Sequence, residues 1–388
     1  MKRACLLFIG LLLAGGCGPW TVRTHPSTPT TSSVPPTTPP PTGFSPPTLS
    51  PVPSSTSTPQ GPVGGPAIVL TANLGSKPVP WHLAARIPLG AAANELGILT
   101  DRMKTPVPVL PPSFAVAPDG SFWVADSIKL RLAHYSAAGM YLGSVSGLYF
   151  DRDHPRARDL VATRRGVDVL EVRDFVSQVT RFGQKGRLSS VSPAAKAILD
   201  LLFSAPHGVT GSLAGSYTGS GHIGSTFSAE PQGFASFDPS TSGALHLLPG
   251  LPVAPGLWIR SRLATPTADQ TYTLTYSSAN STEERHVQFR IVRAIGNKPI
   301  RGVVGASIQA ALDRSVGMFV RLSTSDPNQH TQGGNWYLQV GPGQPVVWER
   351  LPTSPINDSQ QVRHLAAGPN GSVYLMVADA NGESIYRR

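Results

Sequence analysis

The residue types that most often do chemistry are sparse and scattered in this 388-residue chain. The fixed-spacing motifs HExxH, GxSxG, SxxK, the EF-hand loop and the P-loop are all absent. One GxGxxG match, residues 219–224, lies in a Gly/Ser-rich stretch with no predicted strand before it and no helix after it, so it predicts a surface loop rather than a dinucleotide site. Long irregular insertions often bind ligands, and the candidate binding residues of this one are His207, Gly221 and His222. No catalytic residue, metal ligand or cofactor is predicted.

The densest group of charges lies between residues 151 and 168. Five arginines alternate there with four aspartates, a pattern typical of a solvated, ion-paired face. A second interpretation is a contact site for an anionic ligand. Its residues are Arg152, Arg156, Arg158, Arg164 and Arg165.

Two segments far apart in the chain share a signature. Residues 114–126 read FAVAPDGSFWVAD, and residues 365–379 read LAAGPNGSVYLMVAD. Each combines two apolar runs with an Asp-Gly or Asn-Gly turn, which predicts a β-hairpin with a type I′ turn. We expect the terminal Asp126 and Asp379 to accept backbone N–H bonds in the turn that follows, rather than to act in catalysis.

The rest of the chain after about residue 66 also consists of short strand-like runs separated by Gly, Pro, Asn and Asp, which indicates an all-β fold. One helix is expected over residues 193–203, with Ser192 as N-cap and Pro193 in its first turn. Four tryptophans lie within or beside predicted strands and are expected to pack between sheets. They are Trp123, Trp258, Trp336 and Trp348.

The first hairpin continues into two more predicted strands, near residues 130–135 and 140–145, and four consecutive antiparallel strands make a propeller blade. The run from residue 112 to residue 145 resembles an NHL-type repeat. The matching residues are Pro112, Asp119-Gly120, Val124-Ala125-Asp126, Arg131 and Tyr135. This resemblance implies a β-propeller.

The two copies also predict the number of blades and the closure of the ring. Gly120 and Gly371 are 251 residues apart (371 minus 120), which fits five steps of about 50 residues or six of about 42, hence six or seven blades. We prefer six, because the insertion around residues 185–230 lengthens the spacing. The C-terminal copy lacks a fourth strand, and a strand such as residues 67–74 is expected to complete it. A β-sandwich with similar hairpins is the alternative.

The segment that ends at Cys17 has the pattern of an export signal. Lys2 and Arg3 precede an apolar run, residues 4–13, that is too short for a transmembrane helix. A cysteine after small residues resembles the lipobox of bacterial lipoproteins, although Ala14 stands where leucine is usual. The resemblance implies that Cys17 is diacylated with fatty acids such as palmitate. It also implies that the protein lies on the extracytoplasmic face of the cell membrane. An ordinary secretory signal is the alternative.

The sequence therefore divides into a signal peptide (residues 1–16), the lipidated cysteine with a Pro/Thr/Ser-rich linker (17–65) and a propeller-like domain (66–388). The linker is expected to be disordered, because proline removes backbone donors and few apolar side chains offset the entropy of ordering. The net charge is +10, of which +7 belongs to residues 66–388 once Lys2, Arg3 and Arg23 are subtracted. A basic extracytoplasmic domain suits anionic partners, and nucleic acid is not among those expected.

These observations predict a membrane-anchored extracytoplasmic propeller that binds or presents a protein or a cell-wall ligand. The alternative is a propeller hydrolase or lyase with a divalent metal in its channel, as the resemblance to NHL and gluconolactonase types allows. The acidic residues Asp126, Glu171 and Glu230 are not placed together by the sequence. A third class, the substrate-capture lipoprotein of a transporter, is disfavoured because the alternating helices of its two lobes are missing.

Overall fold

The computed structural model describes residues 68–71, 77–98, 111–146, 157–173, 176–183, 186–190, 198–204, 208–213, 233–236, 246–262, 271–278, 285–292, 300–324, 332–352, 361, 363–379 and 382–388. All of them lie in the second of the two units into which the chain divides, Gln60–Arg388. Within these residues, no helix has the length and apolar character needed to cross a membrane.

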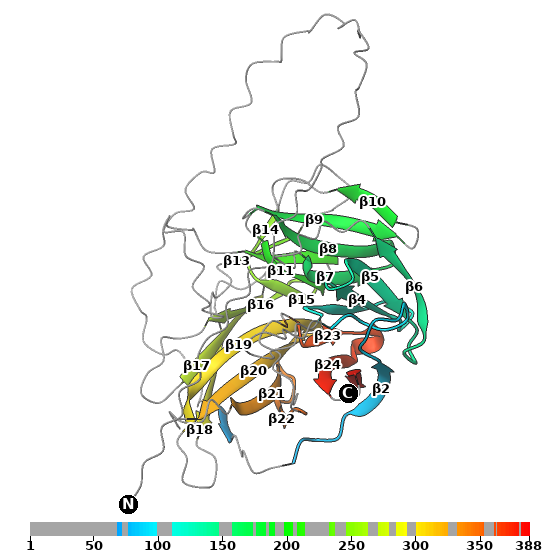
Figure 1. Cartoon of the computed structure of the whole chain (residues 1–388). Coiled ribbons are helices and arrows are strands. Elements are labelled where there is room, and N and C mark those ends of the chain that lie inside the picture. Colours follow the sequence, from blue (N-terminus) through cyan, green and yellow to red (C-terminus); the bar gives the residue numbers. More distant parts are fainter. Residues whose placement is uncertain are drawn as a thin grey trace, which may run out of the picture. The chain divides into compact units, whose positions relative to one another are not determined.

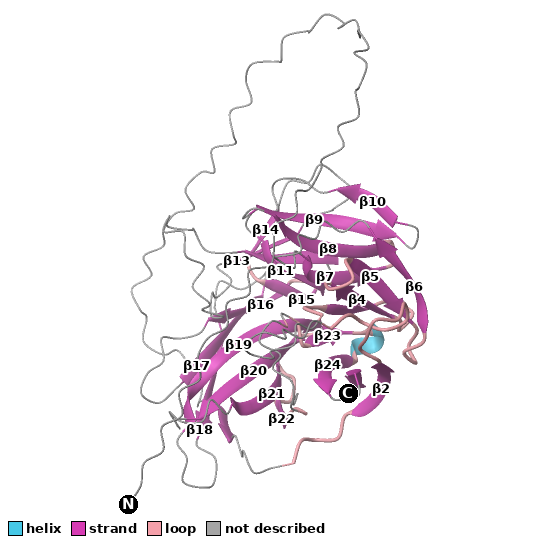
Figure 2. Cartoon of the chain, in the orientation of Figure 1, coloured by secondary structure: helices cyan, strands magenta, loops and turns pink. Residues whose placement is uncertain are grey.

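The described strands form small antiparallel sheets in a propeller-like arrangement, so the expected all-β class is confirmed (Figures 1 and 2). The first sheet contains β3 (Phe114–Val116), β4 (Phe122–Asp126), β5 (Arg131–Tyr135) and β6 (Tyr141–Ser146). The second contains β7 (Ala157–Thr163), β8 (Gly166–Arg173), β9 (Val176–Gly183) and β10 (Gly186–Ser190). The third contains β11 (Ile198–Ser204), β12 (Gly208–Leu213), β13 (Gly233–Ser236) and β14 (His246–Leu248).

Of the remaining three sheets, the fourth and the last include a strand from the N-terminal part of the chain, and the fifth does not. The fourth contains β15 (Leu251–Ala254), β16 (Leu257–Arg262), β17 (Thr271–Ser278), β18 (Arg285–Val292) and, beside β18, β1 (Ile68–Thr71). The fifth contains β19 (Ile300–Leu312), β20 (Ser315–Thr324), β21 (Gln332–Val340) and β22 (Val347–Arg350). The last contains β23 (Leu365–Ala367), β24 (Val373–Asp379), β25 (Gly382–Arg387) and β2 (His82–Ile87).

The first strand of each sheet lies on the inside of the arrangement. Each inner strand contacts the inner strand of the next sheet along the chain, and β23 of the last sheet contacts β3 of the first. The inner strands are β3, β7, β11, β15, β19 and β23. Side chains that leave these strands on their inner side therefore meet side chains from distant parts of the sequence.

The last sheet is completed by an N-terminal strand, but not by the predicted one. β2 pairs antiparallel with β25, from His82 opposite Arg387 to Ile87 opposite Glu383. The strand within residues 67–74 is β1, which instead pairs in parallel with β18 of the fourth sheet. A β-branched run predicts that a strand forms, but the choice of partner depends on packing that the run itself does not encode.

The N-terminal segment, residues 68–71 and 77–87, touches three sheets in succession. β1 lies on the edge of the fourth sheet. The backbone N–H of Val79 donates to the carbonyl oxygen of Arg350 at 3.2 Å, and the indole Nε1 of Trp81 donates to Glu349 Oε2 at 3.1 Å, both on the fifth sheet. β2 then joins the last sheet. The segment thus follows the outer edges of three neighbouring sheets.

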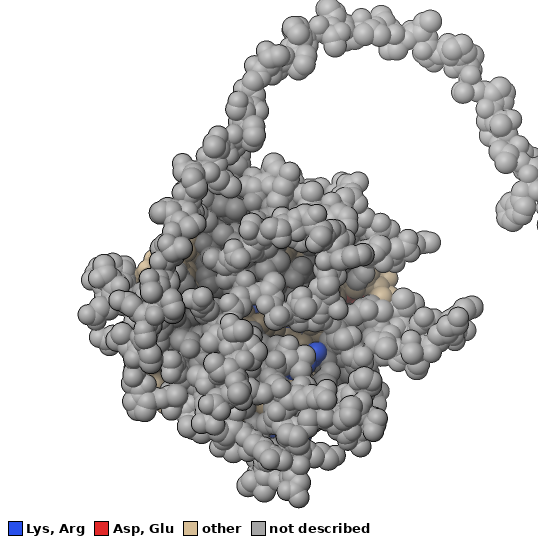
Figure 3. Space-filling view, turned by 90° about the vertical axis from the view of Figure 1, so that its left-hand side faces the viewer, with Lys and Arg blue, Asp and Glu red and all other residues tan. Residues whose placement is uncertain are grey.

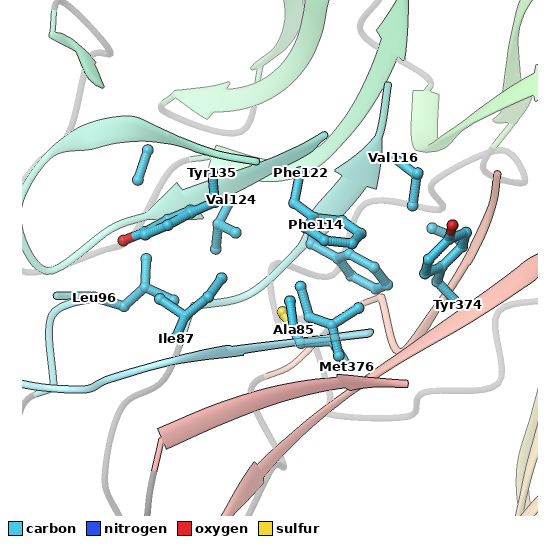
Figure 4. Packing of buried hydrophobic residues seen from close by; sticks show 13 residues of the cluster. Ala85, Ile87, Leu96, Phe114, Val116, Phe122, Val124, Tyr135, Tyr374 and Met376 are labelled. Carbon is cyan, nitrogen blue, oxygen red and sulfur yellow. The ribbon is translucent and has the colours of Figure 1, made fainter. Parts of the chain in front are cut away.

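Hydrophobic clusters fill the spaces between neighbouring sheets. Between the first and last sheets, Phe114 and Phe122 face Met376 and Tyr374, while Tyr135 lies over Leu96 and Ile87 (Figure 4). The rings of Phe122 and Tyr374 meet edge to face with centroids 5.6 Å apart. Since each fully buried large apolar side chain contributes about 1.5–3 kcal/mol, this packing is the main force that holds the sheets together.

The two predicted hairpins have different turns. In the second, Asn370 (φ 60°) and Gly371 (φ 75°) both adopt positive φ, as a type I′ turn requires. In the first, only Gly120 does (φ 85°), and its N–H donates to the carbonyl of Ala117 at 2.8 Å. The type I′ prediction is therefore right for the second hairpin and wrong for the first, where Asp119 holds a type I turn by accepting bonds from the N–H and hydroxyl of Ser121 at 3.0 and 2.6 Å.

The expectation of a helix over residues 193–203 is wrong. Residues 198–204 form β11, which pairs antiparallel with β12 from Ser204 opposite Gly208 to Ile198 opposite Leu213. A short apolar run such as ILDLLF fits the buried face of either a helix or a strand, and pairing with a neighbouring strand outweighs local helix propensity. Ser192 and Pro193, the expected start of the helix, lie outside the described residues.

Candidate functional site

A cluster of buried polar side chains lies where four inner strands approach one another. Asp159 belongs to β7 and Gln309 to β19, while Ser113 directly precedes β3 and Arg363 lies two residues before β23. All four are at most 6 % exposed. We call these four residues the central polar cluster.

An ion pair between Arg363 and Asp159 is the centre of this cluster. Arg363 Nε donates to Asp159 Oδ1 at 2.7 Å, and Arg363 Nη2 donates to Asp159 Oδ2. Ser113 Oγ also donates to Asp159 Oδ1, at 2.7 Å. Such a pair is costly to break, because a buried charge would lose its counterion.

Gln309 extends the cluster to the fifth sheet. Its carbonyl oxygen accepts a bond from Arg363 Nη1 at 2.6 Å. Its side-chain Oε1 accepts the backbone N–H groups of His364 and Leu365, both at 2.8 Å. The cluster therefore ties the first, second, fifth and last sheets together by hydrogen bonds as well as by apolar contacts.

The Asp159 carboxylate has little capacity left for chemistry. Its oxygens accept two bonds from Arg363 and one from Ser113, and Oδ1 accepts a fourth from the backbone N–H of Leu160 at 2.9 Å. A carboxylate offers about four lone-pair sites. Asp159 is thus suited to hold strands together rather than to bind a metal or take up a proton from a substrate.

A small cavity lies beside the central polar cluster. Its empty space is about 290 Å³ including the part open to solvent, but the volume that water centres can occupy is only about 20 Å³, enough for about one molecule. The walls are mostly small apolar residues of the inner strands, with Gln309 and Arg363 as the polar ones. The lining residues are Phe114, Ala115, Val116, Leu160, Gln309, Ala310, Ala311, Arg363, Ala366 and Ala367.

Sequence reasoning missed all four members of this cluster, although one signal pointed to it. Ser113, Asp159 and His364 each lie seven residues before a glycine in the turn after the inner strand (120 minus 113, 166 minus 159, 371 minus 364). Those glycines, Gly120, Gly166 and Gly371, all have positive φ. The spacing marks a polar position near the start of the inner strand in the first, second and last sheets.

His364 occupies that position in the last sheet and is buried without charge. Its ring stacks on Phe319 of β20, with centroids 4.0 Å apart. Burial, with a smaller contribution from the nearby Arg321 charge, lowers the pKa of His364 to about 3. His364 is therefore a neutral structural residue at neutral pH.

Asp126 holds a loop, residues 88–98, against the first sheet. Its Oδ1 accepts the N–H groups of Gly97 (3.1 Å) and Lys129 (3.2 Å), and its Oδ2 accepts Arg131 Nε at 2.9 Å. Lys129 Nζ and Arg131 donate in turn to carbonyl oxygens of the loop, including that of Glu95 at 2.7 and 2.5 Å. The predicted structural role of Asp126 is confirmed: it accepts the N–H of the turn that follows, and it also fixes a second loop.

Ser121, His134 and Asp119 form the one Ser-His-Asp group that we find in the described residues. The Ser121 hydroxyl donates to Asp119 Oδ1 at 2.6 Å, and His134 Nε2 lies 2.9 Å from Ser121 Oγ. The hydroxyl proton thus points to the carboxylate, and His134 Nε2 must carry its own proton as the donor to Ser121. Burial lowers the pKa of His134, and its ring stacks on Trp123 at 4.0 Å. The order of bonds is the reverse of a catalytic triad, in which the base accepts the serine proton.

The predicted anionic-ligand residues are only partly described. Arg164 and Arg165 lie on the turn between β7 and β8 and are exposed. Arg158 belongs to β7, and Arg152 and Arg156 lie outside the described residues. Figure 3 shows one face of the molecule, on which a Lys or Arg side chain of the described residues is visible at the surface.

Of the other predicted residues, some lie within the described part of the chain and some lie outside it. Cys17, His207, Gly221 and His222 lie outside the described residues. Among the predicted tryptophans, Trp336 is buried in a hydrophobic cluster shared by the fourth and fifth sheets, as expected of packing between sheets. Its ring stacks on Trp348 of the neighbouring strand in its own sheet, with centroids 4.8 Å apart. The part of the chain that the structure describes contains no group of three or more His, Cys, Asp or Glu side chains placed to hold a metal ion.

Comparison with known proteins adds a family match and a set of weak structural likenesses. Residues 80–154, from just before β2 to just beyond β6, match a domain of unknown function (DUF7485). No curated protein sequence matches the chain.

Three solved structures are similar to the chain at low sequence identity. A streptogramin B lyase structure is 11% identical with a TM-score of 0.31, covering 72% of this chain and 93% of that one. A protein from Lactobacillus plantarum is 11% identical with a TM-score of 0.35, covering 74% and 83%. A member of the DUF4221 family from Bacteroides vulgatus is 9% identical with a TM-score of 0.21, covering 80% and 94%. At these scores the likenesses carry no argument about function.

Proposed function

We propose that this chain is a lipid-anchored, extracytoplasmic six-bladed propeller that binds or presents a protein or a cell-envelope ligand on its outer surface. The observation that carries the binding role is the central polar cluster. The Asp159 carboxylate is saturated by Arg363, Ser113 and the backbone N–H of Leu160, and the neighbouring cavity has room for about one water. The interior is built for rigidity, which leaves the loops and edges as the surface for recognition.

The proposal of six blades rests on the sheets and their contacts. Six sheets are described, five of them with four consecutive strands in chain order before β1 is counted, and the last with three consecutive strands and β2. Their inner strands contact one another in a cycle that ends with β23 against β3. The pairing of β2 with β25 supplies the fourth strand of the last sheet, as closure of a propeller ring requires.

The proposed anchor rests on the sequence pattern that ends at Cys17, and it is tested by replacing that residue. Cys17→Ala should shift the protein from the membrane fraction to the soluble extracytoplasmic fraction or leave its signal uncleaved. Cys5→Ala is the matched control, because Cys5 lies within the signal and should leave fractionation and processing unchanged. A Cys17→Ala protein that is cleaved and still sediments with membranes would disprove the anchor.

The proposed anionic ligand is tested at the exposed turn between β7 and β8. Replacing both Arg164 and Arg165 by Glu should weaken binding of the full chain to isolated cell-wall fragments and flatten the salt dependence of binding. Arg314→Glu is the control, since Arg314 is an exposed arginine on the turn between β19 and β20. Equal binding by the two proteins would place the anionic contact elsewhere.

The metal-dependent hydrolase or lyase is the competing function. Elemental analysis of the purified full chain distinguishes the two, because a bound divalent metal in a one-to-one ratio would favour the enzyme. A metal content near zero, together with binding that survives chelation, would favour the binding module.

A further inference from the structure

The outer edges of the six sheets are protected in different ways, with one exception. β1 covers the edge of β18, and Val79 and Trp81 contact β22. β14 is only three residues long, while β10 and β2 carry the arginines Arg187 and Arg86. Short length, charge and a covering segment are the usual ways of preventing an edge strand from pairing with another chain.

β6 is the edge strand that has none of these three protections in the described part of the chain, although it carries a β-bulge, which also disfavours edge pairing where it lies. Its six residues, YLGSVS, contain no charge and no proline, and β5 is its only partner among the described strands. Met140, just before the strand, is 66% exposed and Leu142 within it is 55% exposed, the two largest values for large apolar residues of the described part. Figure 1 shows β6 along the outer side of the molecule.

A bulge explains why Leu142 points outward. Tyr141 lies opposite Tyr135 and Gly143 lies opposite His134, so that Leu142 is the extra residue between them. Beyond the bulge, the residues from Gly143 to Ser146 pair regularly with β5. The strand therefore offers a regular uncharged edge next to one exposed apolar side chain.

We propose that β6 pairs antiparallel with β6 of a second copy of this chain, about a two-fold axis. Antiparallel pairing of identical strands is self-complementary, as a two-fold interface requires. The chain has a net charge of +10, so most of its surface repels a second copy, and an uncharged strand is where two copies approach at least electrostatic cost. The contact joins the two first sheets into one continuous sheet.

The size of this contact predicts its strength. A single pair of six-residue strands buries less area than the roughly 1,200–2,000 Å² of a stable complex. The self-association should therefore be weak and reversible for free chains, and it should strengthen when two copies are confined to one surface. It does not depend on the proposed ligand or on the anchor.

Disulfide trapping tests the pairing directly, because Cys5 and Cys17 are the only natural cysteines. Single cysteines at Leu142, Ser144 and Ser146 in the full chain, with a mild oxidant, should give cross-linked dimers that peak at the position nearest the two-fold axis. The controls are the natural chain and Arg165→Cys, an exposed site on the second sheet. Cross-linking at all three β6 positions that does not exceed the Arg165→Cys control would overturn the proposal.

A charged residue on the edge gives an independent test. By sedimentation of the full chain, Leu142→Lys should weaken self-association about tenfold or more, since two lysines would meet across the axis. Leu83→Lys is the matched control, because Leu83 is 50% exposed on β2, the edge of the last sheet. Equal weakening by both variants would indicate unspecific apolar contact, and a natural chain that stays monomeric at every concentration would also refute the pairing.

Discussion

The first and last hairpins share a sequence signature but are built into their sheets differently. β3 and β4 are followed directly by β5 and β6, so the first sheet is made from one continuous stretch of chain. β23, β24 and β25 need β2, from the opposite end of the chain, to complete their sheet. The same local motif thus belongs once to a sheet made from one continuous segment, and once to a sheet that needs a strand from a distant segment.

The aspartates that end the two hairpins show the effect of this difference. Asp126 is fully buried and accepts bonds from Gly97, Lys129 and Arg131. Asp379 is 23% exposed in its side chain, accepts a bond from Ser384 Oγ at 2.9 Å, and lies 3.9 Å from Arg86 Nη2. Local sequence sets the hairpin, whereas the neighbouring segments decide how much each residue contributes.

The last hairpin is also tied to the second sheet by the ion pair between Arg363 and Asp159 of β7, and breaking this pair should have the largest effect. Arg363→Ala leaves the Asp159 carboxylate buried without its cation, which should lower the free energy of unfolding by about 3–5 kcal/mol in urea titrations. Arg388→Ala is the control, because the Arg388–Glu349 pair is 37% exposed at the arginine and should cost about 1 kcal/mol or less. If Arg363→Ala does not fold, the double variant Asp159→Leu/Arg363→Leu should recover much of the stability, and its failure would count against the ion pair as the cause.

The two terminal aspartates give the next largest contrast. Asp126→Asn should destabilise the protein by about 2–4 kcal/mol, because Arg131 then lacks a buried counterion. Asp379→Asn removes a longer, partly exposed contact and should cost about 1 kcal/mol or less. Equal losses of unfolding free energy would mean that the burial of Asp126 has no energetic consequence.

His364 occupies the polar position before the inner strand of the last hairpin, whereas Ser113, which does not titrate, occupies it in the first. The pH dependence of stability therefore distinguishes the two hairpins. The folded pKa of His364, about 3, lies below the ordinary 6.5, so the unfolded chain takes up this proton first. Its contribution to stability is complete above pH 6.5 and falls as the pH drops toward 3, by about 2 kcal/mol between pH 6.5 and 5. His364→Leu should flatten the pH dependence of the urea midpoint in this range, and a parallel curve would refute the assignment.

The turns provide the smallest contrast. Asn370→Gly should leave stability within about 0.5 kcal/mol, because Asn370 already has positive φ and glycine adopts it freely. Asp119→Gly should cost about 1 kcal/mol, because it removes both hydrogen bonds to Ser121 from a residue without positive φ. Thermal unfolding of the two variants gives the comparison, and a larger loss in Asn370→Gly would contradict it.

The sequence was sufficient for the elements whose signals are local. The Asp-Gly and Asn-Gly turns, the apolar runs beside them and the small residues between strands predict the hairpins and the all-β class. The signal fails where partners are distant. Residues 198–204 satisfy a helix and a strand equally well until β12 is placed beside them, and β2 carries no mark that distinguishes it from β1 as the closing strand.

The central polar cluster was out of reach for the same reason. Asp159 and Arg363 are 204 residues apart, and neither lies in a motif of fixed spacing. The alternation of Asp and Arg between residues 151 and 168 predicts a solvated, ion-paired face, and it does not reveal that the Asp159 side chain is buried. Only the seven-residue spacing to a turn glycine sets it apart.

The path of the N-terminal segment has a consequence for the order of folding. His82 pairs with Arg387, 305 residues later (387 minus 82), so β2 is synthesised long before its partner β25. The loss of chain entropy on joining such distant strands is large, and contacts of this kind form late. We expect the first sheet to fold while β2 is still unpaired, which makes the pairing of β2 with β25 the step that commits the whole domain to its native state.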